Sequence, residues 1–299
     1  MEIKKLALLA IAAATLIGCS CKTTSVLIVS GQNNHNWPVS QLALQQILNN
    51  SGLFSADIAL TPEAGGDMST FKPSFKDYDV VLLDYNGDDW CEETNDAFLE
   101  FVNNGGGVVV YHAADNAFTD WEEFNRIIAL GGWGGRDKKS GPYCYLVNDE
   151  LVRDYDTEGP GGNHGQQREY NMHCRNTNHP VTAGLPDNWK HGMDELYDSM
   201  RGPANIKDLL YSGKSDDTTG GSGREEPLVF TVDYGKARIF HIMIGHCGPT
   251  LEDKHAMQCT GFQTLLLRGT EWAATGKVKQ PVPADFPTPD VPSFRLDYK

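Results

Sequence analysis

A histidine placed directly after an apolar run is the first feature of this sequence that points to chemistry. His112 follows the apolar residues 108–111 and precedes two small residues, Ala113 and Ala114, which permit a tight turn from strand to helix. Proteins of alternating strands and helices place catalytic side chains at such turns, and imidazole transfers protons near neutral pH or binds a metal. The alternative is a histidine that only packs at a strand end. The position favours a functional role.

A second histidine ends another apolar segment. His246 follows residues 239–245 and precedes the loop-forming residues 247–249, so we expect it to be exposed and functional. His241 lies inside the same segment, where a hydrogen-bonded role in the core is the better prediction. Imidazoles at two separate strand ends suggest a shared acid–base site.

A third histidine stands in a run of polar residues. His35 has Asn33 and Trp37 nearby, and this combination suits a sugar, because amides and imidazole bind hydroxyl groups and an aromatic face covers the ring. An asparagine-rich turn that caps the next helix would look the same. Both interpretations stay open.

The carboxylates that could assist these histidines are Asp194 and Glu195. Either would supply a base or orient an imidazole, although adjacent carboxylates are more often a solvated surface. His164, His173 and His179 are further candidate ligands. Three histidines and a carboxylate would suit a divalent metal, but their spacing along the chain assigns no ligand set. The metal ligands are therefore left unknown, no cofactor is certain, and a divalent metal stays an open alternative.

The elements that must position these residues alternate between strand and helix. Apolar runs predict strands near residues 26–29, 58–60, 80–83 and 108–111, and patterns of helical period predict helices near 38–47, 93–102, 121–130 and 262–274. This order indicates an α/β fold with a doubly wound, mainly parallel, flavodoxin-like sheet. Ligands of such sheets bind beyond the carboxyl ends of the strands. That rim would collect His35, Asp84, Asn86, Asp88, His112 and Asp115.

The middle of the chain is less regular. Residues 131–136 and 159–165 are rich in glycine, as expected of long irregular loops over a pocket, and 216–226 reads as a surface loop. Residues 228–232 and 238–244 predict a hairpin. The proline-rich end of the chain is expected to be extended.

Composition limits the possible partners. The chain has 299 residues and a net charge of −15, so it repels nucleic acid and nucleic-acid binding is not expected. The cysteines after Cys19 follow no zinc or redox spacing, and we expect mostly free thiols in the core. Standard nucleotide, serine-hydrolase and zinc-protease motifs are absent from the sequence.

The first residues read as a targeting segment. Lys4 and Lys5 precede the apolar residues 6–17, which are too few to span a bilayer comfortably but typical of a signal peptide. They end in Gly18 and Cys19, which resemble a lipobox, so Cys19 is the expected lipidation site. The chain is then divided into a signal peptide (1–18), a tether (19–24), an α/β domain (25–278) and a tail (279–299). We expect a lipoprotein that faces the periplasm or the cell exterior and contacts membrane only through its lipid.

Six short stretches, in order along the chain, carry a family resemblance. They are GQNNH at 31–35, GGG at 105–107 with YHAADN at 111–116, NHPVTAGLP at 178–186, DELY at 194–197, GKAR at 235–238 with GH at 245–246, and EWAA at 271–274. Together they resemble the ThuA-like (trehalose utilisation) family of the class I glutamine amidotransferase-like superfamily.

The resemblance implies a role in sugar metabolism. Members of the family are associated with the breakdown of disaccharides and glycosides through 3-keto-sugars. The implied site contains His35, His112, His179, Asp194, Glu195 and His246. Glutamine amidotransferases have a nucleophilic cysteine where this chain has His112, so glutaminase activity is not expected.

The sequence thus predicts a carbohydrate-processing protein that cleaves or rearranges a glycoside or 3-keto-sugar by acid–base chemistry. The expected catalytic residues are His112, His246, Glu195 and Asp194. The expected substrate-binding residues are His35, Asn33, Trp37, Asp84, Asn86, Asp115, Asn116, His164 and His179. The alternatives are a non-catalytic sugar-binding lipoprotein, which Trp133 would serve equally well, and a scaffold for a protein partner.

Overall fold

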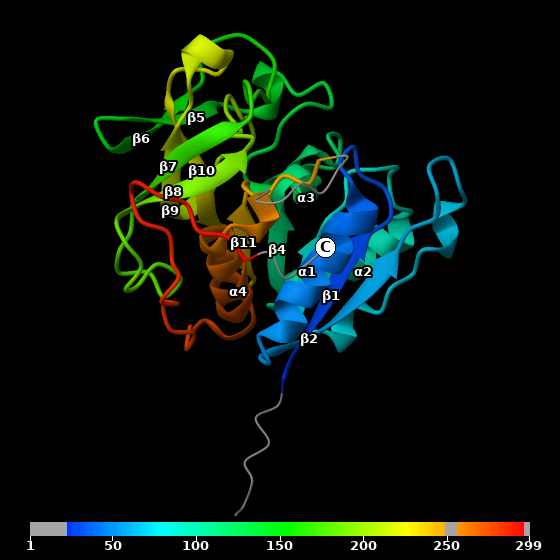
Figure 1. The fold of residues 1–299 in the computed structure, drawn as a ribbon. Coiled ribbons are helices and arrows are strands. Elements are labelled where there is room, and N and C mark those ends of the chain that lie inside the picture. The colour runs from blue at the N-terminus through cyan, green and yellow to red at the C-terminus, as the bar shows by residue number, and fades with distance from the viewer. Residues whose placement is uncertain (1–22, 249–255, 296–299) are drawn as a thin grey trace, which may run out of the picture.

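The computed structural model describes residues 23–248 and 256–295 (Figure 1). The predicted signal peptide and Cys19 lie outside these residues. The α-helices of the described part are α1 (Trp37–Asn50), α2 (Glu92–Asn103), α3 (Glu122–Ile128) and α4 (Thr260–Thr275). Its strands are β1 (Thr24–Ser30), β2 (Phe54–Leu60), β3 (Val80–Leu83), β4 (Gly107–Tyr111), β5 (Tyr143–Val147), β6 (Glu150–Asp154), β7 (Arg168–Cys174), β8 (Asn188–Asp194), β9 (Ile206–Lys214), β10 (Glu225–Val232) and β11 (Arg238–Ile242).

One half of the sheet is parallel and follows the order β2-β1-β3-β4-β11. Strands β3 and β4 are buried along their whole length, and their continuous apolar runs are typical of strands covered on both faces. Helices α1 and α4 lie in front of this half in Figure 1, with α2 and α3 behind it. The predicted strands and helices of this half are present.

The other half of the sheet is antiparallel and continues β11-β10-β9-β7-β8, with β5 and β6 joined to β10. Six of the ten strand pairings between described residues are antiparallel. The expected mainly parallel, doubly wound, flavodoxin-like sheet is therefore wrong: the sheet is mixed and mostly antiparallel, and helices are few. The predicted hairpin is confirmed as β10 and β11.

The incorrect prediction has a physical cause in β5 to β9. These strands are exposed on part of their surface, as the mixed burial along β7 shows, so they lack continuous apolar runs. Polar residues such as Asn171 and His173 made β7 read as loop, although antiparallel strands commonly face solvent on one side. A region expected to be irregular therefore supplies half of the sheet.

The alternation of strand direction brings distant segments to one rim. Strands β4 and β11 are parallel, and each step from β11 through β10, β9 and β7 to β8 reverses direction. Four reversals give β8 the same direction as β11. The carboxyl ends of β1, β4, β8 and β11 therefore lie at one rim.

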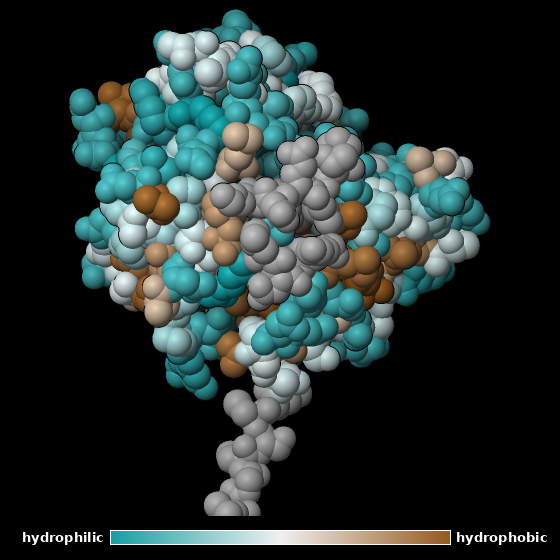
Figure 2. Space-filling model, in the orientation of Figure 1, coloured by the Kyte–Doolittle hydropathy of each residue, from teal (hydrophilic) through white to brown (hydrophobic). Residues whose placement is uncertain are grey.

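The tail is extended along the domain. The Lys190 backbone donates to Thr288 O (2.9 Å) and the Thr260 backbone donates to Ser293 O (2.9 Å), which fixes the tail to β8 and α4. Figure 2 shows a mainly hydrophilic face with scattered apolar spots. Within the described ranges no helix has the length and apolar character needed to cross a bilayer.

Candidate active site

Four side chains from four strand ends meet at this rim. His35 follows β1, His112 follows β4, Glu195 follows β8 and His246 lies four residues beyond β11. One nitrogen of each imidazole and one oxygen of the carboxylate all lie within 4.8 Å of one another. We call these four residues the His–Glu cluster. The expectation that His35, His112 and Glu195 share one site is met by this geometry.

Glu195 is the centre of the cluster. Its Oε2 lies 3.6 Å from His35 Nε2, 3.7 Å from His112 Nε2 and 3.2 Å from His246 Nδ1. Burial alone would raise the pKa of Glu195, but hydrogen bonding and charge from the three histidines hold it well below its usual range. Glu195 is therefore ionised at neutral pH.

His112 is the most deeply buried member. Its backbone has φ 44°, an uncommon left-handed conformation that turns the chain directly after β4. Nδ1 lies 2.6 Å from Met243 O and Nε2 lies 3.2 Å from the Tyr197 hydroxyl, whose ring stacks on the imidazole. Burial, together with the neighbouring His35, lowers the pKa of His112 to about 3. The ring is therefore neutral at physiological pH.

His35 is held by its asparagine neighbours. Its Nδ1 lies 3.2 Å from Asn33 Oδ1 and 3.1 Å from Asn34 Oδ1, so Nε2 faces Glu195. Asn86 fixes Asn34 by accepting from its backbone N–H at 3.1 Å and by donating to its side-chain oxygen. Asn86 also donates to Ala113 O, which determines the orientation of its amide.

Asp194 lies beneath the cluster and faces away from solvent. Its Oδ1 accepts from the backbone N–H of Glu195 (2.8 Å) and His246 (3.0 Å). Its Oδ2 accepts from the backbone N–H of Gly245 (2.7 Å) and lies 2.7 Å from His191 Nε2. Asp194 positions two members of the cluster instead of contacting the pocket.

His246 forms a close ion pair with the carboxylate. Its buried Nδ1 has no hydrogen-bond partner, although it lies 3.2 Å from Glu195 Oε2. Burial lowers the pKa of His246, and the adjacent Glu195 outweighs this effect and raises it overall.

A pocket of about 360 Å³ opens above the cluster. Trp133 forms one wall, with φ 50° and its backbone N–H bound to Gly161 O at 2.7 Å. Gly162, at φ +91°, permits this close approach, because a Cβ there would lie 2.7 Å from the Trp133 nitrogen. The lining consists of Asn34, His35, Asn86, Asn116, Trp133, Gly134, His164, Glu195 and Tyr197.

Comparison with known proteins decides the family. A family model described as "Trehalose utilisation" (ThuA) matches residues 25–273. This chain belongs to the ThuA family. The match spans most of the domain that carries the cluster, and the resemblance predicted from the sequence is confirmed.

One similar solved structure supports the same family, and a second is reported with it. A ThuA-like protein from Parabacteroides merdae ATCC 43184 is 63% identical, with 93% of this chain and 99% of that chain covered and a TM-score of 0.91. A ThuA-like protein from Bacteroides uniformis ATCC 8492 is 19% identical, with 86% and 93% covered and a TM-score of 0.49. A search of curated proteins gave no match.

Several predicted residues of this ThuA-family chain line the pocket or support it. His35, Asn86, Asn116, His164 and Glu195 line it, and Asn33 supports His35 from behind. His164 is separate from the cluster: its Nε2 lies 3.8 Å from Glu195 Oε1 and its side chain is 37% exposed. It is therefore the imidazole most open to a ligand in the pocket.

Other predicted residues lie elsewhere. Asp84 is buried and accepts from Ser40 Oγ at 2.6 Å, and burial raises its pKa to about 7. Asp115 is buried 3.4 Å from His241, and His179 packs against Trp272. These three residues and Trp37, the first residue of α1, are not among the lining residues. The structure does not bring them into the pocket.

Three functional neighbours were given no role from the sequence. Tyr197 contacts His112, Asn34 supports His35, and Gln167 Nε2 donates to Glu195 Oε1 at 3.3 Å. A signal existed for Tyr197, because it ends the DELY stretch at 194–197. No pattern marked Gln167, which precedes a strand read as loop.

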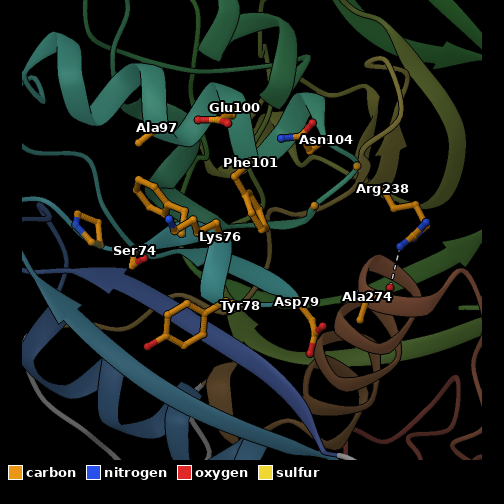
Figure 3. A pocket seen from close by; sticks show the side chains of 14 residues that line it. Ser74, Lys76, Tyr78, Asp79, Ala97, Glu100, Phe101, Asn104, Arg238 and Ala274 are labelled. Carbon is orange, nitrogen blue, oxygen red and sulfur yellow. Dashed lines mark hydrogen bonds between the residues drawn. The ribbon is translucent and has the colours of Figure 1, made fainter.

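The larger cavity, of about 620 Å³, lies at the opposite rim (Figure 3). It is bounded by Asp79 before β3, Gly106 before β4 and Arg238 at the start of β11. Arg238 donates to the carbonyls of Ala273 and Ala274 at the end of α4, and the dashed line in Figure 3 marks the second of these bonds. No member of the His–Glu cluster lines this cavity.

Proposed function

We propose that this ThuA-family protein is a carbohydrate-processing enzyme that cleaves or rearranges a glycoside or 3-keto-sugar in the pocket above the His–Glu cluster. The observation that carries the proposal is the meeting of three imidazoles and Glu195 at the floor of a polar and aromatic pocket. The description of the matched family, trehalose utilisation, agrees with a sugar as substrate.

The pocket wall supports a sugar ring. The Trp133 side chain is half-buried and contacts Tyr197 with ring centroids 4.8 Å apart, so its orientation is constrained before a ligand binds. Asn116 lines the same pocket, and its Oδ1 is buried without a hydrogen-bond partner. An aromatic face beside amide side chains is a combination that suits a pyranose.

The chemistry that fits is removal of a proton next to a carbonyl. In a 3-keto-glycoside the base takes the C2 proton and the C2–H electrons form an enolate. The enolate then forms the C1–C2 double bond as the C1–O bond breaks, and the leaving oxygen takes the proton back from the protonated base. His164 faces the pocket and is the imidazole best placed to accept the proton. The His–Glu cluster borders the same pocket through His35 and Glu195.

The roles first predicted for His112 and His246, as acid and base, find less support. His112 is buried and neutral, with both ring nitrogens occupied by Met243 and Tyr197. A buried ring with low proton affinity is a poor acid at neutral pH. We assign proton transfer to His164 and a supporting role to the cluster.

The test is turnover of a panel of glycosides and their 3-keto derivatives by the full chain, with product analysis. Glu195→Gln should abolish conversion, whereas His173→Gln, on β7 outside the pocket lining, should retain it. Conversion by Glu195→Gln at the rate of the unchanged chain would contradict the proposal. Binding of a sugar without any conversion would favour the second candidate, a non-catalytic sugar-binding protein, which the Trp133 wall also suits.

We also propose that the chain is a lipoprotein anchored through Cys19. This rests on the sequence of the first residues, where an apolar run ends in Gly18 and Cys19. Metabolic labelling with a fatty acid should modify the unchanged chain but not Cys19→Ala. Equal labelling of both would remove the proposed anchor.

A further inference from the structure

Three imidazole nitrogens and one carboxylate oxygen face a common point at the floor of the pocket. We propose that His35 Nε2, His112 Nε2, His246 Nδ1 and Glu195 Oε2 bind one divalent transition-metal ion. This inference goes beyond the proposed function and does not depend on which sugar, if any, the protein converts.

The distances fit a mononuclear site. Zinc-like ions bind histidine and carboxylate ligands at about 2.0–2.2 Å, so two ligands of one tetrahedral ion lie about 3.3–3.6 Å apart. The three nitrogens lie 3.2, 3.6 and 3.7 Å from Glu195 Oε2. The separations among all four ligand atoms extend to 4.8 Å, so the imidazoles would close in by up to about 1 Å around a tetrahedral ion.

Hydrogen bonds to Nδ1 of His112 and His35 leave Nε2 of each ring available as a metal ligand. His112 Nδ1 faces Met243 O, and His35 Nδ1 faces the side-chain oxygens of Asn33 and Asn34. These oxygens only accept hydrogen bonds, so both Nδ1 atoms carry the proton of the neutral ring. The lone pairs of the two Nε2 atoms then point toward Glu195, which is the arrangement that second-sphere acceptors create around bound metals.

His246 supplies the third nitrogen and an independent indication. Its Nδ1 is buried, lies 3.2 Å from Glu195 Oε2 and has no hydrogen-bond partner. An unpaired buried nitrogen is costly, and a metal ion would satisfy it.

The surroundings of the cluster hold its ligands in place. Asp194 fixes the backbone of Glu195 and His246, and Gln167 donates to Glu195 Oε1, the carboxylate oxygen that does not face the imidazoles. Ligands fixed by an outer layer of hydrogen bonds are typical of metal sites.

The donor set limits the class of ion. Three imidazole nitrogens and one carboxylate oxygen suit Zn²⁺, Fe²⁺, Co²⁺, Ni²⁺ or Mn²⁺, whereas Ca²⁺ and Mg²⁺ prefer oxygen ligands. His35 and Glu195 line the pocket, so an ion among these ligands would be reached from that side. It would act as a Lewis acid on a substrate oxygen.

The first experiment is titration of the metal-free full chain with Co²⁺ and Zn²⁺. We expect one ion per chain, visible absorption bands for Co²⁺, and loss of affinity by more than about 100-fold in His35→Gln and His246→Gln. His173→Gln is the matched control, since His173 pairs with Glu225 outside the cluster, and it should bind like the unchanged chain. Circular dichroism would show that each variant is folded.

X-ray absorption of the zinc-loaded unchanged chain decides the matter even if a variant fails to fold. Three imidazole ligands per zinc are expected. No binding by the unchanged chain, fewer than two imidazoles per zinc, or equal affinity in His35→Gln, His246→Gln and the control would overturn the proposal. Metal binding without sugar conversion would leave this site in place and contradict only the proposed function.

Discussion

The Asp194 carboxylate and the His246 backbone are joined by a 3.0 Å hydrogen bond between residues 52 positions apart in the chain. The same Oδ1 atom accepts from the Glu195 N–H at 2.8 Å. Asp194 thus connects the end of β8 to the loop after β11, and it sets the distance between a carboxylate and an imidazole of the cluster. The first prediction follows from this connection.

Replacing Asp194 with asparagine should weaken metal binding by about 10–100-fold, the range typical of outer-layer residues. The amide removes one acceptor, so at least one buried N–H donor loses its partner, and the free energy of unfolding should fall by about 3–5 kcal/mol. Calorimetry with Zn²⁺ and urea denaturation measure the two effects. Asp208→Asn, which alters a carboxylate on β9 away from the cluster, should leave zinc affinity unchanged.

Replacing Trp133 with alanine should weaken sugar binding by about tenfold or more without changing metal affinity, because the ring covers the pocket wall but is not a ligand. Calorimetric titration with the sugar and, separately, with Zn²⁺ measures the two affinities. If the affinities for sugar and for metal fall together, Trp133 supports the cluster and does not bind the sugar directly.

Replacing His164 with glutamine should lower kcat by about 10²–10⁴-fold, which is the usual contribution of a general base. Zinc affinity should stay the same, because His164 lies outside the cluster. Steady-state kinetics and zinc titration test both statements. Full activity in this variant would assign proton transfer to another residue.

Replacing Tyr197 with phenylalanine should preserve or slightly increase metal affinity. The Tyr197 hydroxyl lies 3.2 Å from His112 Nε2, and a metal ion would take the lone pair of that nitrogen. Competition from the hydroxyl therefore disappears in the variant. Tyr211→Phe, which removes a buried hydroxyl that donates to Pro186 O, is the control, and a marked loss of affinity in Tyr197→Phe alone would contradict the account.

Metal affinity should fall as the pH is lowered. Glu195 raises the pKa of His246 above its ordinary value of 6.5 despite burial, so a proton competes with the metal below that raised pKa. Affinity should fall by about tenfold per pH unit there, with one proton released per ion. His112, whose pKa is about 3, adds no second proton in the neutral range.

The stability of the metal-free chain should depend on pH in the opposite direction: it should fall as the pH rises. A raised pKa in the folded state means that the protonated His246–Glu195 pair stabilises the fold fully below about pH 6.5, and this contribution is lost as the pH rises through the raised pKa. His246→Gln should remove that dependence. Thermal unfolding of both metal-free chains across pH 5–9 checks it, and identical pH profiles would contradict the argument.

The sequence predicted the parallel half of the fold because its strands are continuous apolar runs. For the same reason it located His112, which directly follows β4, and His35, which lies in the loop after β1. It could not predict the antiparallel half, since β7 and its neighbours face solvent on part of their surface. The family resemblance implied Glu195 as a site residue, but without β8 the apolar pattern did not show how it reaches the three histidines.

Several residues predicted for the site lie outside the cluster, and the sequence pattern alone could not show this. Asp194 and Glu195 are adjacent in sequence, yet a strand directs neighbouring side chains to opposite sides, so only Glu195 enters the cluster. His179 lies in a stretch that resembles the family, but its ring packs against Trp272. Asp84 and Asp115 end or follow apolar strands, and burial there made them structural carboxylates.

Anomalous diffraction from crystals of the zinc-loaded chain, recorded at the zinc absorption edge, tests the central claim most directly. The account predicts a single strong peak about 2.0–2.2 Å from His35 Nε2, His112 Nε2, His246 Nδ1 and Glu195 Oε2. A zinc peak located only at other residues, with the four side chains still in mutual contact, would contradict it.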